Sequence, residues 1–456
     1  MNIARPALLI LIACTALLAA CQVDPLTGKN TINLYSYEDE KAMGDENVQP
    51  IIAELGGLYP DMQTQQYVDG IGQAVVKAGR TRLKEEAEFP DWDFQFYVVN
   101  TSMINAFALP GGHVFVTRGI LNQIDDEAEL AGLLGHEVTH VFARHGVERM
   151  SEQTLMLLPL ALLSAFEETQ GVAVVGIVAV QLLSMSYGRA DEEESDHFGM
   201  RFAARAGYHP AGVIGVMQML KEVTDAAGGG PPEFLSTHPD PGNRVKYLTE
   251  QLNKEYPNAD NDGRYARNGG QFTTAMVDMR AAQPAYDLAD QGDAIMSAGF
   301  EAHNGGDAAG AEAKYREALD LYRRAAAMQA GHSILHVNVA QAQFYLGDYA
   351  SAETAARRAL DLDGSAFWPN FMGGLIAIKN EQNGVAQARL QNALKLVPGS
   401  PVGLYYLAVS YDREDDRANA VLNYRKTYDA MQGEGDLAAN ARTRLIELGE
   451  PDPAGP

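Results

Sequence analysis

The sequence predicts a mostly α-helical protein with a small β-hairpin or sheet, in which a metal-binding domain precedes an α-solenoid. Three observations carry this prediction. A histidine pair with helical spacing lies at residues 136–140, apolar residues alternate on either side of a Pro-Gly-Gly turn between residues 94 and 117, and alanines recur at a period of 34 beyond residue 287. The length of 456 residues allows two to three domains.

The amino terminus predicts export. Arg5 precedes an apolar run at residues 7–18, and small residues lead to Cys21, a pattern typical of a bacterial signal peptide at residues 1–20. The segment 18–21 (LAAC) resembles a lipobox, so we expect Cys21 to be the lipid attachment point. Gln22 rather than Asp resembles sorting to the outer membrane, which places the expected chain in the periplasm, lipid-anchored. An ordinary signal cleaved at a nearby alanine is the alternative.

The first secondary-structure signal of the metal-binding domain is a pair of β-like stretches. Residues 94–99 and 113–117 alternate around the turn at 110–112, which predicts a hairpin. Its exposed edge is expected to bind an extended peptide by strand addition. His113 and His145 lie near the metal motif and are expected to be ordinary polar residues rather than ligands.

Residues 136–140 spell HEVTH, the spacing of a zinc site on a helix. Residues four apart share a helix face, so His136 and His140 can bind one ion while the Glu137 carboxylate reaches its water. Asp126 with Glu129 predicts a capping box at the start of this helix. An apolar stripe supports it independently: Leu130, Leu133, Leu134, Val138, Val141 and Phe142. The alternative is a chance match on a histidine-bearing helix.

Two apolar stretches follow, at residues 155–166 and 171–185. Each is shorter than the roughly twenty residues that a spanning helix needs. We expect a helical hairpin that packs on the domain or at the membrane surface, and that is a candidate lid.

A catalytic zinc needs a third protein ligand and an open position for water. Ala143 and Gly146 stand where a metzincin would have Gly and His, which excludes that class. In the acidic helix start at residues 188–200 we predict Glu192 as the third ligand and Asp196, one turn later, as the carboxylate that orients a ligating imidazole. The alternative for Glu192 is a solvated surface charge at a helix N-terminus.

Hydrolysis of a peptide bond follows from these residue types. Zinc lowers the pKa of bound water, Glu137 takes the proton, and the hydroxide attacks a carbonyl polarised by the same metal. His238 and Arg244 are the candidates to stabilise the oxyanion. His238 could instead fill the open coordination position and keep the enzyme latent, or be a structural loop histidine, and Arg244 could instead pair with Asp196 or Glu192.

With residues 105–119 and residues 236–239 (STHP) ahead of Arg244, these motifs make the chain resemble the zinc metallopeptidases that include HtpX and the CAAX prenyl proteases. Within that family it is similar to the periplasmic BepA-like proteins with C-terminal tetratricopeptide repeats. The family's E-x-x-x-D segment, whose Glu is the third ligand, matches Glu192 and Asp196. Gly188 departs from the family, which usually has Ser there. The resemblance implies a gluzincin-type domain at residues 21–255 with one Zn²⁺ per chain.

The amino-acid composition changes after residue 255. A polar stretch predicts a linker at 256–286, and Ala-rich helical pairs then predict tetratricopeptide repeats at 287–450, with a disordered tail at 451–456. Three sets of residues share the period of 34: Ala352, Ala386 and Ala420; Ala359, Ala393 and Thr427; Leu360, Leu394 and Tyr428. The unit at 306–319 matches the one at 347 with an offset of 41, so its helices should be seven residues longer. A generic helical bundle is the alternative.

The net charge and the family resemblance together limit the classes of partner that we expect for this protein. The formal net charge of −25 argues against nucleic acid and against attraction to anionic lipid. The resemblance implies an endopeptidase for misfolded or incompletely assembled envelope proteins, with the outer-membrane protein assembly machinery as a further partner class. The alternative is a tetratricopeptide adaptor or chaperone whose zinc domain is latent or structural.

Overall fold

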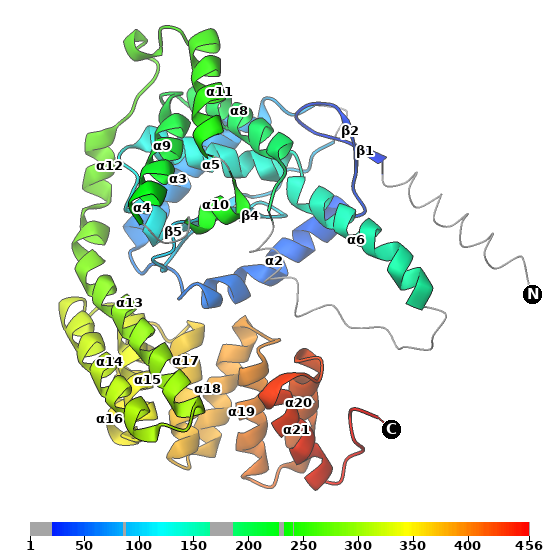
Figure 1. Cartoon of the computed structure of the whole chain (residues 1–456), viewed down its shortest axis with the longest axis vertical. Coiled ribbons are helices and arrows are strands. Elements are labelled where there is room, and N and C mark those ends of the chain that lie inside the picture. Colours follow the sequence, from blue (N-terminus) through cyan, green and yellow to red (C-terminus); the bar gives the residue numbers. More distant parts are fainter. Residues whose placement is uncertain (1–20, 85–87, 165–185, 228–231, 240, 456) are drawn as a thin grey trace, which may run out of the picture. The chain divides into compact units, whose positions relative to one another are not determined.

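The structure is a computed structural model that describes residues 21–84, 88–164, 186–227, 232–239 and 241–455 (Figure 1). The expected signal peptide therefore lies outside the described residues. Contacts divide the described chain into two compact units. One holds the residues up to 277 except 49–60, and the other holds 49–60 together with the residues from 278 onward. The predicted fold class, a mostly helical metal-binding domain with a small sheet followed by helical repeats, is confirmed.

Two small sheets lie in the first unit. β1 (Cys21–Val23) pairs antiparallel with β2 (Asn30–Ile32). β3 (Gln95–Val99), β4 (Ala106–Leu109) and β5 (His113–Thr117) form a second sheet in the order β3-β5-β4. The predicted pairing of 94–99 with 113–117 as a hairpin is wrong, because β3 runs parallel to β5 and the arms of the hairpin are β4 and β5. The turn at 110–112 follows β4 directly, and its Gly111 and Gly112 take φ of +84° and +94°.

The two edges of this sheet differ. A side chain of α3 (Met62–Arg80) covers the β3 edge: Gln65 Nε2 donates to Val98 O at 2.8 Å and Val98 N donates to Gln65 Oε1 at 2.9 Å. Gln73 Nε2 donates to Phe94 O just before the strand, at 2.8 Å. On β4, by contrast, no further strand of the described chain pairs with the outer edge. β4 is thus the edge that remains available for strand addition.

The other elements of this part of the chain are helices (Figure 1). They are α2 (Tyr37–Glu54), α3, α4 (Arg118–Leu121), α5 (Glu127–Phe142), α6 (His145–Ser164), α8 (Arg189–Arg205), α9 (Gly212–Ala227), α10 (Glu233–Thr237), α11 (Pro241–Glu255) and α12 (Gly269–Ala275), with a 3-10 turn η2 (Ala259–Asn261). The C-terminal half of α6 takes in the first apolar stretch up to residue 164, while the remainder of the expected hairpin and lid lies outside the described residues. Among the described helices, none combines the length and apolar composition needed to cross a bilayer.

Close packing of α5 against α8 explains the glycine before the metal motif. A Cβ added at Gly135 would lie 2.7 Å from Gly199 O, and one added at Gly199 would lie 2.7 Å from His136 N. The two helix backbones therefore meet at this point, which brings the α8 carboxylates within reach of the α5 imidazoles. Gly132 meets α9 in the same manner, at 2.5 Å from Val213 N.

Much of the segment expected as a linker packs on the first unit. Tyr208 and Ala266 form a β-bridge, Glu127 N donates to Arg267 O at 2.9 Å, and Asn268 Nδ2 donates to Glu127 Oε2 at 2.6 Å. Phe272 of α12 is fully buried. Hydrogen bonds at the start of α5 thus hold part of this stretch on the first unit, and the second unit begins near residue 278.

The second unit contains successive helical pairs. They are α13 (Val277–Asn304), α14 (Ala308–Met328), α15 (Ser333–Tyr345), α16 (Tyr349–Leu362), α17 (Phe367–Lys379), α18 (Asn383–Leu396), α19 (Pro401–Asp412), α20 (Arg417–Ala430) and α21 (Gly435–Glu447). α14 has 21 residues and α16 has 14, which is the predicted difference of seven. Of the residues with the period of 34, Ala352, Ala386, Ala420, Ala359, Ala393 and Thr427 are fully buried.

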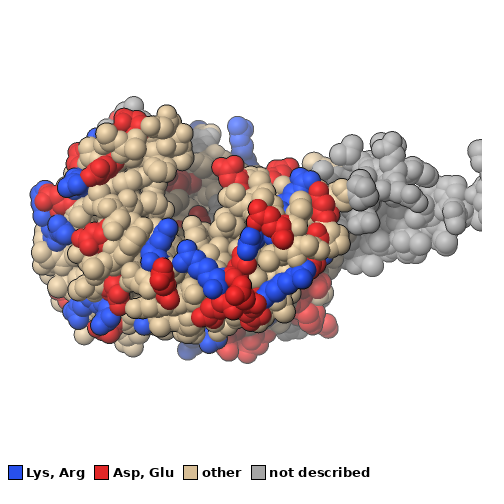
Figure 2. All heavy atoms as spheres, turned by 90° about the horizontal axis from the view of Figure 1, so that it is seen from below, with Lys and Arg blue, Asp and Glu red and all other residues tan. Residues whose placement is uncertain are grey.

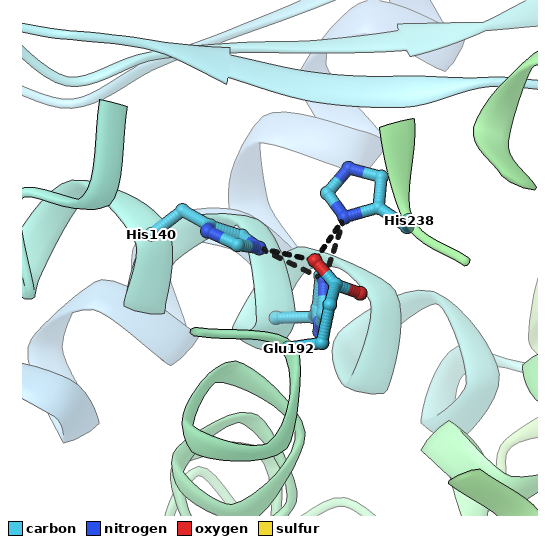
Figure 3. Close-up of side chains that lie close together, drawn as sticks. His140, Glu192 and His238 are labelled. Atoms are coloured by element: carbon cyan, nitrogen blue, oxygen red, sulfur yellow. Dashed lines mark hydrogen bonds and ion pairs between the residues drawn. The ribbon is translucent and has the colours of Figure 1, made fainter. Parts of the chain in front are cut away.

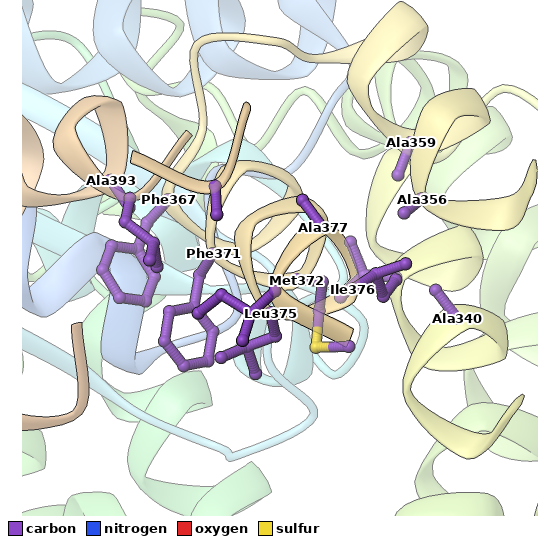
Figure 4. Packing of buried hydrophobic residues seen from close by; sticks show 14 of the residues in the cluster. Ala340, Ala356, Ala359, Phe367, Phe371, Met372, Leu375, Ile376, Ala377 and Ala393 are labelled. Atoms are coloured by element: carbon purple, nitrogen blue, oxygen red, sulfur yellow. The ribbon is translucent and has the colours of Figure 1, made fainter. Parts of the chain in front are cut away.

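The alanines let the helices of the array approach closely. Figure 4 shows Ala356, Ala359 and Ala393 on helices that flank the large side chains of α17, among them Phe371 and Ile376. Small residues at helix crossings and large ones between them fill a continuous core, as expected of a solenoid. The expected disordered tail is described to residue 455, where Arg442 Nε donates to Asp452 Oδ1 at 2.7 Å.

Residues 49–60 belong to this second unit although they precede it by more than two hundred residues. Trp368 Nε1 donates to Ala53 O at 2.7 Å, and the Tyr59 ring lies 5.9 Å from the His332 ring and 6.3 Å from the Tyr286 ring. α2 therefore begins in one unit and ends in the other.

Charges of both signs mix on the surface. On the face in Figure 2, lysine and arginine side chains are interspersed among aspartates and glutamates. On the array, ion pairs one helical turn apart, such as Arg316 with Glu312 and Arg357 with Glu353, neutralise part of the acidic excess locally.

Candidate metal centre

Four elements supply the centre. α5 carries His136, Glu137 and His140, and it begins at the predicted N-cap, where Asp126 Oδ1 accepts a hydrogen bond from Glu129 N at 2.8 Å. α8 carries Glu192 and Asp196 one turn apart. His238 follows α10 directly, and Arg244 lies in the first turns of α11. The side chains of all seven of these predicted residues are buried.

His136, His140, Glu192 and His238 each offer an atom, and these atoms lie within 4.8 Å of one another. His136 Nε2 is 3.1 Å from His140 Nε2 and 3.2 Å from His238 Nδ1. Glu192 Oε1 is 3.4 Å from His140 Nε2 and 2.8 Å from His238 Nδ1. Figure 3 shows His140, Glu192 and His238 converging from separate elements.

This group suits zinc. Ligand atoms about 2.0–2.1 Å from a tetrahedral zinc ion are on the order of 3.4 Å apart, close to the separations seen here. Two or three imidazoles with one carboxylate form a donor set that favours zinc over magnesium or calcium, because those two ions bind mostly oxygen ligands. His238 Nε2 and both Glu137 oxygens are buried and have no hydrogen-bond partner within the described chain. Such atoms are costly to bury unless something else binds them.

Asp196 and Arg244 contact the proposed ligands His136 and Glu192 and fix their orientation. Asp196 Oδ1 lies 2.9 Å from His136 Nδ1, and Arg244 donates to Asp196 from Nε at 2.8 Å and from Nη2 at 2.7 Å. Arg244 Nη1 also lies 2.7 Å from Glu192 Oε2. Burial would raise the pKa of Asp196, but the Arg244 charge and the hydrogen bonds hold it well below its usual range. The structure thus places Arg244 as an ion-pair partner of both carboxylates.

Glu137 has a different environment. Burial is the largest influence and raises the pKa of this carboxyl, while the His238 and His136 charges oppose it. Its Oε1 lies 3.9 Å from His238 Nε2. A carboxylate with a raised pKa and no hydrogen bond is suited to accept a proton near neutral pH.

His238 is held between two aromatic rings. The Phe234 ring stacks on it at 4.4 Å between centroids, and the Tyr187 ring lies on it at 5.3 Å. Tyr187 also stacks on His140 at 3.9 Å, and its backbone N donates to Thr237 O at 3.1 Å. Sequence reasoning missed Tyr187. Its only signal was its place just before Gly188 in the segment that leads to Glu192.

The remaining two histidines near the motif lie outside the group of four. His145 Nδ1 is 3.0 Å from His140 Nδ1, and its ring is buried behind the ligand. His113 on β5 contacts Asp45 through Nε2 at 2.8 Å.

Comparison with known proteins places this geometry in a family. Residues 67–252 match the model of peptidase family M48. The beta-barrel assembly-enhancing protease of Yersinia pestis is 31% identical over 251 residues, 53% of this chain and 49% of that protein. The protein of the same name from Escherichia coli (strain K12) is 28% identical over 247 residues, 51% and 48% of the two chains. Human mitochondrial metalloendopeptidase OMA1 is 28% identical over 239 residues, 50% and 45%.

The chain spans about half the length of the curated relatives it matches. Among solved structures, MamA from residue 41 to its end, from Desulfovibrio magneticus RS-1, covers 36% of this chain and 97% of its own, with 19% identity and a TM-score of 0.27. That likeness is too low to argue from. The match to the family model spans both ligand-bearing helices and the loop of His238, and on it this chain carries a domain of peptidase family M48.

Proposed function

We propose that this protein is a zinc-dependent endopeptidase of the bacterial cell envelope that acts on misfolded or incompletely assembled envelope proteins. The observation that carries the proposal is Glu137, whose buried oxygens accept no hydrogen bond within the described chain while they lie beside three imidazoles and a carboxylate. A purely structural metal site has no need of a base at this position.

The residues divide the chemistry among them. His136, His140 and Glu192 would hold one zinc ion, which would supply the Lewis acidity that activates water and polarises a carbonyl. Glu137 accepts the proton from that water and returns it to the leaving amine. Asp196 fixes the orientation of His136, and Arg244 fixes Asp196 and Glu192.

His238 has two possible roles, and its position supports one for the conformation described. His238 Nδ1 lies among the proposed ligand atoms, so His238 would fill the fourth position on a bound zinc ion and keep the enzyme latent. Displacement by substrate would open a position for water. The swung-out imidazole would then be the candidate donor to the oxyanion.

Substrate and location follow from the sheet, the amino terminus and the relatives. The open edge of β4 suits an unfolded segment that adds as a strand, with main-chain affinity and little sequence preference. The relatives named as beta-barrel assembly-enhancing proteases support envelope proteins as substrates and the outer-membrane assembly machinery as partner, with the repeats as the binding surface. A lipid on Cys21 would hold the chain at the outer membrane, facing the periplasm.

A second candidate function is an adaptor or chaperone with a permanently latent zinc domain. The same observation supports it, namely that His238 lies among the proposed ligands. The two candidates differ in whether any substrate releases that imidazole.

Hydrolysis of an unfolded model protein by the zinc-loaded chain tests the proposal. Wild type should cleave, Glu137→Gln should lose cleavage while retaining zinc, and His238→Ala should cleave faster. Glu193→Gln, an exposed carboxylate on the same helix as Glu192, is the matched control and should match wild type. If neither wild type nor His238→Ala cuts while zinc is bound one per chain, the adaptor candidate replaces the peptidase.

A further inference from the structure

A small pocket opens beside His140, on the side of the ligand that faces the sheet. β4 and the turn after it form one wall, the start of α6 forms another, and the stacked Tyr187 ring forms a third. The lining residues that matter here are Ala108, Leu109, Pro110, His140, Gly146 and Tyr187. Apart from His140, none of these side chains has a role in the proposed hydrolysis.

The position of the pocket ties it to the bond that would be cut. The pocket is lined by His140, one of the residues proposed to hold the metal. Ala108 and Leu109 lie on the strand whose outer edge has no partner in the described sheets. In a peptide that adds to this edge, successive side chains point to opposite faces, and alternate ones point toward the layer of α5. The pocket is where one such side chain would lie.

The size of the pocket restricts that side chain. Its free volume is about 10 Å³, which is about the space of one water molecule or one methyl group. Leu109 and Val147 in its walls are about 1% exposed and packed in the core. Tyr187 is fixed by its stacking on His140 at 3.9 Å. These walls leave little freedom to widen.

The floor of the pocket is polar but already paired. Arg144 Nε donates to Glu40 Oε1 at 2.6 Å, Nη2 donates to Tyr35 O at 2.8 Å, and the guanidinium lies 4.2 Å from the centroid of the Tyr37 ring. A charged side chain that entered would lose its hydration without finding an unpaired group of opposite charge here, which is costly. The pocket therefore excludes charge as well as bulk.

We propose that this pocket is a substrate subsite that admits only a small uncharged side chain, Gly, Ala or Ser, at one position next to the cleaved bond. The inference rests on the proposed peptidase function. It makes Gly146 and Val147 residues that determine specificity, in addition to the residues that bind metal and move protons.

Gly146 offers a variant that narrows the pocket without strain. A Cβ at this position would lie 3.9 Å from both Pro110 Cγ and Tyr187 Oη, an ordinary contact, and alanine favours a helix over glycine. Gly146→Ala should thus fold and fill the space of the methyl group. Val147→Ala widens the pocket and serves as the opposite variant.

The test measures kcat/KM on peptides that differ only in Gly, Ala, Ser, Leu, Phe or Glu at each position flanking the cleaved bond, with His238→Ala as a second background. At one position, Ala should exceed Leu, Phe and Glu by at least about tenfold, as steric exclusion from a narrow pocket implies. Gly146→Ala should shift that preference toward Gly, and Val147→Ala should reduce discrimination against Leu.

Two failures are distinguishable. If peptides are cleaved with no preference at any position, or if both variants leave the preference unchanged, the subsite is overturned and the peptidase stands. If no peptide is cleaved by either background at full zinc occupancy, the proposed function itself is overturned, and the subsite with it. Circular dichroism of Gly146→Ala and Val147→Ala confirms that each variant is folded.

Discussion

Asp196 is the residue on which the position of His136 depends. It contacts the ring nitrogen of His136 that faces away from the ligand cluster and receives two hydrogen bonds from Arg244 in turn. The helical spacing predicted that His136 and His140 share one helix face and that Glu192 and Asp196 lie one turn apart on another helix. The structure brings these side chains together, and their roles in metal binding stay predictions. Tyr187 could not be predicted, since its stacking depends on how α5 and the loop of His238 approach each other.

Replacing Asp196 by Asn should weaken zinc binding by about 10- to 100-fold, because the neutral amide orients His136 less firmly and raises its basicity less. Competition against a chromophoric chelator measures the change. Glu193→Gln is the control on the same helix and should bind zinc as wild type does. An unchanged affinity for Asp196→Asn would show that Asp196 serves only to pair with Arg244.

Gly135→Ala should lower the unfolding free energy of the first unit by roughly 1–3 kcal/mol. The added Cβ would lie 2.7 Å from Gly199 O and would force α5 and α8 apart. Urea unfolding measures the loss. Gly70→Ala on α3 is the matched control, because a Cβ there meets nothing within 4 Å and a small gain from helix propensity is expected. A loss of equal size in both variants would contradict the close approach of the two helices.

At the scale of elements, local signals predicted the elements and failed to pair them. β4 carries Ala106, Phe107 and Leu109, all buried, so it lacks the alternation of exposed and buried residues that begins β3. The hairpin was therefore assigned to the wrong partner. The packing of the repeats could be predicted for the opposite reason. A stacked helical pair contacts mainly its sequence neighbours, so the period alone determines which residues meet.

The period also predicts where the array resists change. Ala386 is fully buried among the helices of the array, and Val385 beside it is about half exposed. Ala386→Leu should lower the unfolding free energy of the array by roughly 1–3 kcal/mol through overpacking, and Val385→Ala should change it little. Thermal unfolding followed by circular dichroism compares the two. Equal, small effects would indicate that the helices do not pack at this position.

At the scale of the whole molecule, the described residues divide into two units, and the candidate metal centre lies in the first. The division itself was expected from the change in composition, but residues 49–60 were not expected in the second unit. No local pattern links Ala53 to Trp368, since the two are 315 residues apart in sequence. Contacts of that range are set by the complete fold.

Zinc should therefore stabilise one unit selectively. Metal at about 100 times its dissociation constant adds about 2.7 kcal/mol to the folded state, which for a unit of this size raises its midpoint by roughly 5 to 10 °C. Calorimetry with zinc and with excess chelator should move one transition and leave the transition of the array in place. Movement of both by the same amount would indicate a single cooperative unit.

The most direct test of the central claim compares His238→Ala with the double variant His238→Ala and Glu137→Gln at equal, measured zinc content, on an unfolded model protein. The account predicts cleavage by the single variant and a loss of about 100-fold or more when Glu137 is also replaced. Equal cleavage by the two variants, or no cleavage by either, would contradict the assignment of Glu137 as the base of a zinc endopeptidase.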